Sequence, residues 1–201
     1  MKKSIFFGIT ILGLSTLLFT SCSKLPQAEI DAANAAVEQA KAAGADIYVN
    51  DNYVALQDSL NAVMVSIEAE KSKFIKNYAT SKEGLAGVAS YATEVKQMAE
   101  KRLEEIKLEI EENIAAVNTL IDVNRQLVSE APKGKEGTSA LVAIKGEIDA
   151  IEASIQETGA MLENGEYLAT HEKVKAAKEK ASSINAELTE VIAKYKANAR
   201  R

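Results

Sequence analysis

Apolar residues recur every three or four positions through most of the chain after residue 26, which is the spacing of one face of an α-helix. The first such run comprises Ile30, Ala33, Val37 and Ala40. The pattern stops over residues 45–52. Gly44 is suited to end the first helix and Asp51 to cap the next one.

A second helix is predicted to follow with one apolar face. Its members are Tyr53, Leu56, Leu60, Val63, Ile67 and Phe74. Thr80 and Glu83 have the spacing of a capping box, in which each side chain satisfies a backbone N–H at the other's position. The sequence therefore predicts a break near residues 78–82.

The third predicted helix runs from about residue 83 to residue 128. Its apolar stripe is Val95, Ala99, Leu103, Ile106, Ile110, Ile114, Val117, Leu120, Ile121 and Leu127. Asn113 and Asn124 fall on or beside this stripe. Buried amides there would fix the register of neighbouring helices, as they do in coiled coils, but exposure at the edge of the stripe is the favoured interpretation.

Residues 131–137 contain one Pro and two Gly, and they predict a loop. The next helix carries Leu141, Ile144, Ile148, Ile151, Ile155 and Leu162, and Asn164–Gly165 is suited to end it. The last helix carries Tyr167, Thr170, Val174, Ala177, Ala181, Ile184, Leu188, Val191 and Tyr195. These two helices are expected to pair as an antiparallel hairpin over residues 138–201.

The fold class that follows is all-α. We expect an elongated antiparallel helical bundle with coiled-coil-like hairpins, divided into a region of three helices over residues 22–130 and the C-terminal hairpin. Lys and Glu alternate along the faces away from the apolar stripes, which is typical of solvated surfaces.

The first residues have the pattern of an export signal. Lys2 and Lys3 precede an uncharged stretch over residues 4–23, which is short for a membrane span. The stretch ends in Leu-Phe-Thr-Ser-Cys, which resembles a bacterial lipobox. The resemblance implies that residues 1–21 are a cleaved signal peptide and that Cys22 becomes an N-terminal residue carrying lipid such as palmitate. The alternative is an ordinary secretory signal cut near Ser21, which leaves Cys22 as a free thiol.

Removing residues 1–21 takes away two lysines and leaves 22 basic and 29 acidic side chains, a net charge of −7. Nucleic-acid binding is therefore not expected, because it requires clustered Lys and Arg. With Ser23 and Lys24 after the cysteine in place of acidic residues, sorting in Gram-negative bacteria suggests an outer-membrane anchor with the protein facing the periplasm.

Candidate catalytic and metal-binding residues are few. One Cys and one His cannot form an internal disulfide or a structural zinc site, so no cofactor or metal is expected. His171 is expected to be a solvated surface residue, because no nucleophile or acid is identifiable near it. Acidic residues cluster at Glu104–Glu105, Glu109 and Glu111–Glu112, but without a neighbouring His they are expected to be a solvated face.

Residues 26–100 resemble a helical domain family of unknown function found in envelope lipoproteins, often ahead of OmpA-like peptidoglycan-binding domains. The residues that carry the resemblance are Pro26, Glu29, Ala32, Ala36–Val37, Ala40, Ala43–Gly44–Ala45, Ala55 and Leu60. The chain departs from that family at Val49–Asn50, where Ala-Pro is frequent, and in having no OmpA-like domain. The resemblance implies a cell-envelope address and no particular activity.

The function we expect is therefore structural, scaffolding or binding, by a protein held to the membrane through Cys22. The expected partners are membrane lipid and either envelope proteins or peptidoglycan, with self-association as a further possibility. An enzyme is not expected, because no phosphate-binding loop, dinucleotide glycine pattern or nucleophile elbow is present. The alternative is a helical toxin-like or membrane-remodelling protein, although no long uncharged run follows the signal segment.

Overall fold

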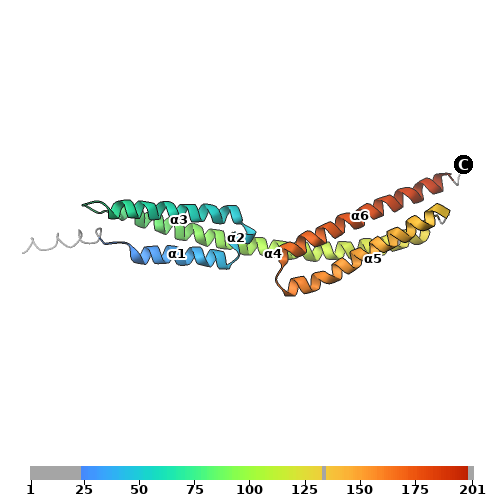
Figure 1. Ribbon diagram of the computed structural model, residues 1–201, viewed down its shortest axis with the longest axis horizontal. Coiled ribbons are helices and arrows are strands. Elements are labelled where there is room, and N and C mark those ends of the chain that lie inside the picture. Colours follow the sequence, from blue (N-terminus) through green and yellow to red (C-terminus); the bar gives the residue numbers. More distant parts are fainter. Residues whose placement is uncertain (1–23, 133–134, 199–201) are drawn as a thin grey trace, which may run out of the picture. The chain divides into compact units, whose positions relative to one another are not determined.

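The computed structural model describes residues 24–132 and 135–198, and the side chains of residues 135–137 are not part of that description. In the described part every regular element is an α-helix, which confirms the all-α helical bundle (Figure 1). The helices are α1 (Gln27–Ala42), α2 (Ala45–Tyr48), α3 (Asn50–Lys71), α4 (Ala79–Glu130), α5 (Lys135–Glu163) and α6 (Tyr167–Asn198). Among these helices, none is both long and apolar enough to cross a membrane.

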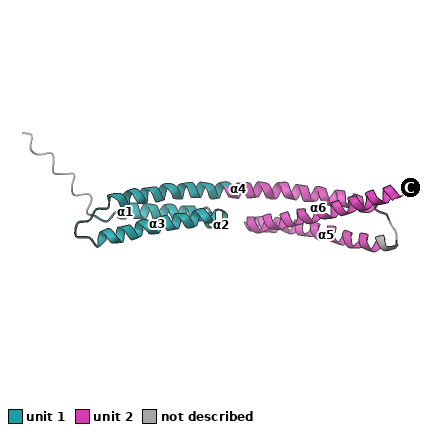
Figure 2. Ribbon diagram, turned by 90° about the horizontal axis from the view of Figure 1, so that it is seen from above, with its two compact units in different colours: residues 1–101 teal, residues 102–201 magenta. Residues whose placement is uncertain are grey.

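The chain forms two compact units that divide inside α4, after Lys101 (Figure 2). The sequence predicts a division at residues 131–137. In the structure this segment instead joins α4 to α5 within unit 2, and α5 already begins at Lys135. A Pro- and Gly-containing segment ends a helix in a turn as readily as in a linker, so composition alone does not distinguish the two.

Unit 1 is built from α1, α2, α3 and the first part of α4. The expected apolar stripe of α1 is buried, and it packs in one cluster with residues of α3 and α4 that include Leu56, Ile67 and Val95. Gly84 allows close packing of α4 against α3, because a Cβ added at Gly84 would lie 2.9 Å from Cγ2 of Val63. The stripes predicted from the helical period therefore form the core of this unit.

The connection from α1 to α3 depends on Gly44. This residue has φ of 82°, in the left-handed region that favours glycine, and its added Cβ would lie 2.6 Å from the ring of Tyr48. Gly44 therefore ends the first helix as predicted. The prediction for Asp51 was wrong: α3 begins at Asn50, so Asp51 is its second residue and does not cap it.

The connection from α3 to α4 lies earlier in the sequence than predicted. Phe74 was assigned to the apolar face of the second helix, but α3 ends at Lys71 and Phe74 is fully exposed in the loop. Thr80 was expected to cap the third helix, yet it lies inside α4. The side-chain oxygen of Asn77 accepts a hydrogen bond from the backbone N–H of Ala79 at 3.0 Å instead.

Unit 2 contains the rest of α4 together with α5 and α6. The paired residues show that α6 runs antiparallel to α5 and parallel to α4. The stripe of α6 is buried from Thr170 to Leu188, but Val191 and Tyr195 are exposed and Ile192 is buried in their place. A straight helix rotates by about 20° per heptad relative to a seven-residue repeat, which accounts for this change of face.

The expectation that the side chain of Asn124 is exposed was wrong. Asn124 lies on the face of α4 that packs against α6 and is completely buried, and its Nδ2 donates to the carbonyl oxygen of Ala181 at 2.8 Å. Its Oδ1 accepts from Nδ2 of Asn185 at 2.9 Å. Because a buried amide requires these partners, the pair of bonds specifies which turn of α6 lies against Asn124.

Candidate functional site

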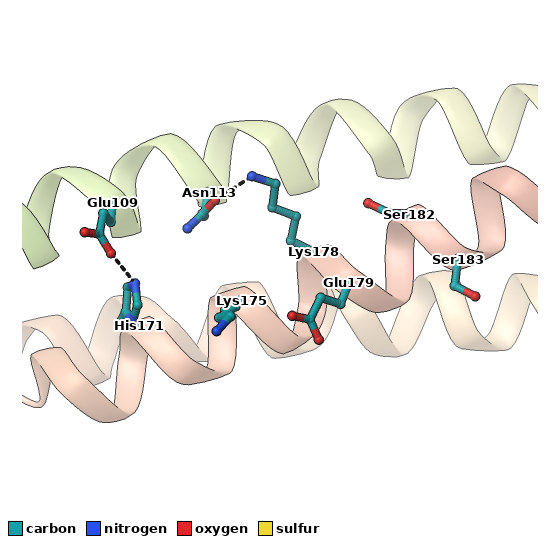
Figure 3. Close-up of a pocket in the computed structure, with 8 residues that line it drawn as sticks. All are labelled: Glu109, Asn113, His171, Lys175, Lys178, Glu179, Ser182 and Ser183. Carbon is teal, nitrogen blue, oxygen red and sulfur yellow. Dashed lines mark hydrogen bonds and ion pairs between the residues drawn. The ribbon is translucent and has the colours of Figure 1, made fainter.

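A polar hollow of about 750 Å³ lies within unit 2 between α4 and α6 (Figure 3). Its lining consists of Glu109, Asn113, His171, Lys175, Lys178, Glu179, Ser182 and Ser183. We call this hollow the α4/α6 groove. Each helix places its buried stripe toward the core and the residues next to that stripe along the groove, so the register of the two helices determines which polar groups meet.

The first pair in the groove is Glu109 with His171. Nε2 of His171 lies 2.6 Å from Oε2 of Glu109, and the His171 side chain is only 13% exposed. Nδ1 of the same ring lies 3.5 Å from Oε1 of Glu172. The expectation that His171 is a solvated surface residue was therefore wrong. Its position beside the buried Thr170 turns the ring toward α4.

Arg102 extends this pair into a network. Its Nη1 lies 3.0 Å from Oε1 of Glu109 and 3.3 Å from Oε2 of Glu105. The guanidinium of Arg102, and secondarily the ring of His171, hold the pKa of Glu109 below its usual range. At neutral pH this part of the groove therefore presents an ionised, already paired carboxylate.

We expect Arg102→Met to raise the pKa of the Glu109 carboxyl toward its usual value. A carboxyl whose pKa is lowered on folding stabilises the folded state above its unfolded pKa, and this contribution is lost as pH falls through the folded value. Side-chain NMR titration of Glu109 is the measurement. Arg125→Met is the matched control, because Arg125 pairs with Asp149 and Glu152 and should leave Glu109 unchanged. The same Glu109 titration in Arg102→Met and in the wild type would contradict this account.

Asn113 and Lys178 form the second pair across the groove, with Nζ of Lys178 donating to Oδ1 of Asn113 at 2.7 Å. Lys175 and Glu179 are exposed along the α6 side, and neither forms an ion pair within the described residues. The groove therefore carries two cross-helix contacts, with one cation and one anion available to a bound partner.

The groove does not have the arrangement of a serine hydrolase. Ser182 lies eleven residues beyond His171 on the same helix, a separation of about 16 Å along the axis, whereas proton transfer requires hydrogen-bond distance. Figure 3 shows both serines at the far end of the groove from His171. Neither serine of the groove therefore lies within reach of the pair formed by His171 and Glu109.

Of the clustered acidic residues of α4, Glu105 and Glu109 meet at Arg102, whose positive charge occupies the point between them. Glu104 pairs with Lys107 at 2.8 Å and Glu109 pairs with Arg102 and His171, while Glu111 and Glu112 are exposed. The described residues contain no group of three or more His, Cys, Asp or Glu side chains that could hold a metal ion. The statement that no His accompanies these carboxylates was wrong for Glu109.

The pairs in the groove were missed from the sequence because their members are about sixty residues apart. A signal was nevertheless present: Glu109 precedes the buried Ile110, and His171 follows the buried Thr170. Residues next to a buried stripe border the neighbouring helix. The predicted lipid-attachment residue, Cys22, lies outside the described residues.

Comparison with protein-family models, with curated protein sequences and with solved structures finds no match to this chain. The resemblance of residues 26–100 to an Ala-rich lipoprotein domain therefore stays a prediction from the sequence.

Proposed function

We propose that this chain is a lipid-anchored protein of the bacterial cell envelope that acts by binding or scaffolding, with its helical units as the working surface. The observation that carries the proposal is the position of Cys22. The chain's sole cysteine stands at the end of an uncharged stretch that follows Lys2 and Lys3. In this proposal the anchor lies in the outer membrane and the helices face the periplasm.

The α4/α6 groove is the surface that we propose for the partner. The groove is open and is lined by side chains of both charges. It therefore favours a ligand that carries positive and negative charges, such as an extended segment of an envelope protein or a peptidoglycan stem peptide. Lys175 and Glu179 supply one charge of each sign without an ion pair in the described part of the chain. Anchoring at a membrane raises the local concentration of the protein, so weak contacts of this kind suffice for binding.

We expect Cys22→Ala to abolish lipid attachment. Cells expressing the wild type and the variant would be grown with a clickable fatty-acid analogue, and the purified chains compared for label and mass. Only the wild type should carry the label, because the thiol of Cys22 is the attachment point in the proposal. Cys22→Ser is a matched control that keeps a nucleophilic side chain of similar size. Equal labelling of the wild type and Cys22→Ala would rule out the anchor.

The binding role is tested by photocrosslinking in cells. A photoreactive residue would replace Lys175 or Glu179 in the groove, and Gln156, an exposed residue of α5 outside the groove, would serve as the control site. The proposal expects the same partner from both groove sites and none from position 156. It also expects reduced capture from position 179 when Lys175→Glu reverses the neighbouring charge. Equal capture from position 156 would show that the groove is not the binding surface.

A further inference from the structure

The loop between α3 and α4, residues 72–78, exposes two large apolar side chains. Phe74 is 103% exposed and Ile75 is 81% exposed, the two largest values among the large hydrophobic side chains that the structure describes. Water-exposed aromatic and branched side chains at the tip of a loop are unfavourable unless another surface covers them. The loop is therefore a candidate contact surface.

The two apolar residues lie in a loop that is fixed at both ends. On the α3 side, the backbone N–H groups of Ser72 and Lys73 donate to carbonyl oxygens of the last turn of α3. On the α4 side, the ring of Tyr78 is buried in the unit 1 core and Asn77 caps α4. Phe74 and Ile75 thus lie exposed between two ordered helix ends, while Tyr78 of the same loop packs into the core.

The surroundings of the two apolar residues are basic. Residues 71–82 include Lys71, Lys73, Lys76 and Lys82 and no acidic residue, in a chain whose net charge is −5. Three of these lysines form ion pairs: Lys71 with Glu68, Lys73 with Glu70 and Lys82 with Glu29, and the Glu70 carboxylate also accepts from the backbone N–H of Asn77 in the loop. Lys76 immediately follows Ile75 and is exposed. An apolar tip with an exposed lysine on each side, Lys73 and Lys76, is complementary to a bilayer with anionic headgroups.

The loop lies at the same end of unit 1 as the beginning of α1. Nζ of Lys82 is 2.7 Å from Oε1 of Glu29, which joins the first turn of α4 to the first turn of α1. Figures 1 and 2 both place the α3–α4 loop beside the start of α1. Pro26 is buried next to this point and lies four residues after Cys22, so the two Cα atoms are at most about 14 Å apart.

We infer that the α3–α4 loop is a second membrane contact, in which Phe74 and Ile75 enter the headgroup region while Lys71, Lys73 and Lys76 meet lipid phosphates. The inference rests on the proposed lipid anchor at Cys22, because that anchor brings this end of unit 1 to the bilayer. Two apolar side chains bind a membrane weakly by themselves, but a nearby tether makes their insertion effectively intramolecular. The anchor then holds the chain at the membrane, and the loop orients unit 1 on it.

The test compares two isoleucines at opposite ends of unit 1. Ile75→Cys places a thiol in the loop, and Ile47→Cys places one in α2, which joins the far ends of α1 and α3. Ile47 is also an exposed isoleucine, at 57%. Each full-length variant would be purified, labelled with an environment-sensitive fluorophore and reconstituted into vesicles of phosphatidylethanolamine and phosphatidylglycerol that contain nitroxide lipids. Mass spectrometry reports whether Cys22 is acylated, in which case it has no free thiol to label.

The expected result is blue-shifted emission that the nitroxide lipids quench at position 75, with solvent-like, unquenched emission at position 47. Adding Lys73→Glu and Lys76→Glu should reduce the quenching at position 75, and vesicles of phosphatidylcholine alone should do the same. Both lysines are exposed, so these changes leave the core of unit 1 intact.

The remaining outcomes separate the inference from the anchor. Unquenched label at position 75 in a chain whose Cys22 is acylated contradicts the inference and leaves the anchor in place. If Cys22 is not acylated, the labels are read in a Cys22→Ser background with vesicles added. Quenching confined to position 75 then supports the membrane contact without the anchor, and absence of quenching contradicts both. The inference is also overturned if, in native envelopes, a protein and not lipid shields the label at position 75 from water.

Discussion

Leu188→Asp is expected to unfold unit 2 while unit 1 keeps its structure. Leu188 is 1% exposed on the buried face of α6. The change removes a buried apolar side chain, which alone costs about 2–5 kcal/mol, and leaves a carboxylate without a partner in the core. The sum is comparable with the free energy of unfolding of an ordinary small domain, about 5–15 kcal/mol.

Hydrogen exchange followed by mass spectrometry is the measurement for Leu188→Asp. Peptides of α5 and α6 should lose protection, whereas peptides of α1 and α3 serve as an internal reference in the same molecule. Val191→Asp is the matched control, because Val191 lies three residues further along α6 and is 44% exposed. Protection of α5 and α6 in Leu188→Asp at the wild-type level would contradict the packing of unit 2 described above.

Asn124→Asp is expected to destabilise unit 2 in a way that depends on pH. An ionised Asp at this position still accepts a hydrogen bond from Asn185. Its second oxygen, however, faces the carbonyl oxygen of Ala181, to which Asn124 donates a hydrogen bond. The protonated acid can donate to Ala181 and avoids a buried charge. Burial should therefore raise the pKa of the new carboxyl in the folded state above its unfolded value near 4.

The sign of the pH dependence follows from this raised pKa. Because the folded state binds the proton more tightly, the destabilisation is small below about pH 4 and grows as pH rises, by about 1.4 kcal/mol per unit until the folded pKa is passed. For a fully buried carboxyl, whose pKa can rise by three units or more, this amounts to roughly 4 kcal/mol at neutral pH.

The measurement is urea unfolding of Asn124→Asp and of the wild type at several pH values between roughly 3.5 and 7.5, the range in which protonation of the new carboxyl should change stability. Each pH value gives the difference between the two free energies of unfolding. Asn118→Asp makes the same chemical change at an exposed position of α4, and its difference from the wild type should stay nearly constant with pH. A pH-independent difference for Asn124→Asp would mean that the carboxyl is hydrated, and Asn124 would not be the buried register contact that we describe.

Asn124 also bears on the proposed binding surface. The bonds of Asn124 fix the register of α6 on α4, and this register places His171 beside Glu109 and Lys178 beside Asn113. Loss of the register would rearrange the α4/α6 groove even in a chain that stayed helical. A variant that keeps its helix content but loses partner capture would thus point to the register as the basis of the site.

The loop proposal gives unit 1 a separate role. Its core explains how α1, α3 and α4 are held together, but not why Phe74 and Ile75 are left in water. A membrane contact beside the proposed anchor accounts for their exposure and for the exposed Lys73 and Lys76 on either side of them. In that arrangement unit 1 meets the membrane, and the groove of unit 2 serves the partner.

The sequence by itself determined the helical class of this protein and most of the residues on the faces that its helices bury. The helical period marked the stripes of α1, α4 and α6, and Gly44 and Gly165 marked two helix ends, both with positive φ in the structure. These features are local, because a period of 3.6 residues and a left-handed glycine depend on neighbouring residues alone. The all-α fold class followed from them without any knowledge of contacts.

The tertiary structure decided which faces meet and which residues have no partner. Phe74 continues the stripe of α3 in register with Ile67, yet no helix covers that position and the chain turns before it. Asn124 and His171 were expected to be solvated, but α6 and α4 cover them. Periodicity shows which face of a helix is apolar, but not which helix packs against that face. The burial of a single polar side chain depends on the register between two helices, and contacts between residues about sixty positions apart in the chain set this register.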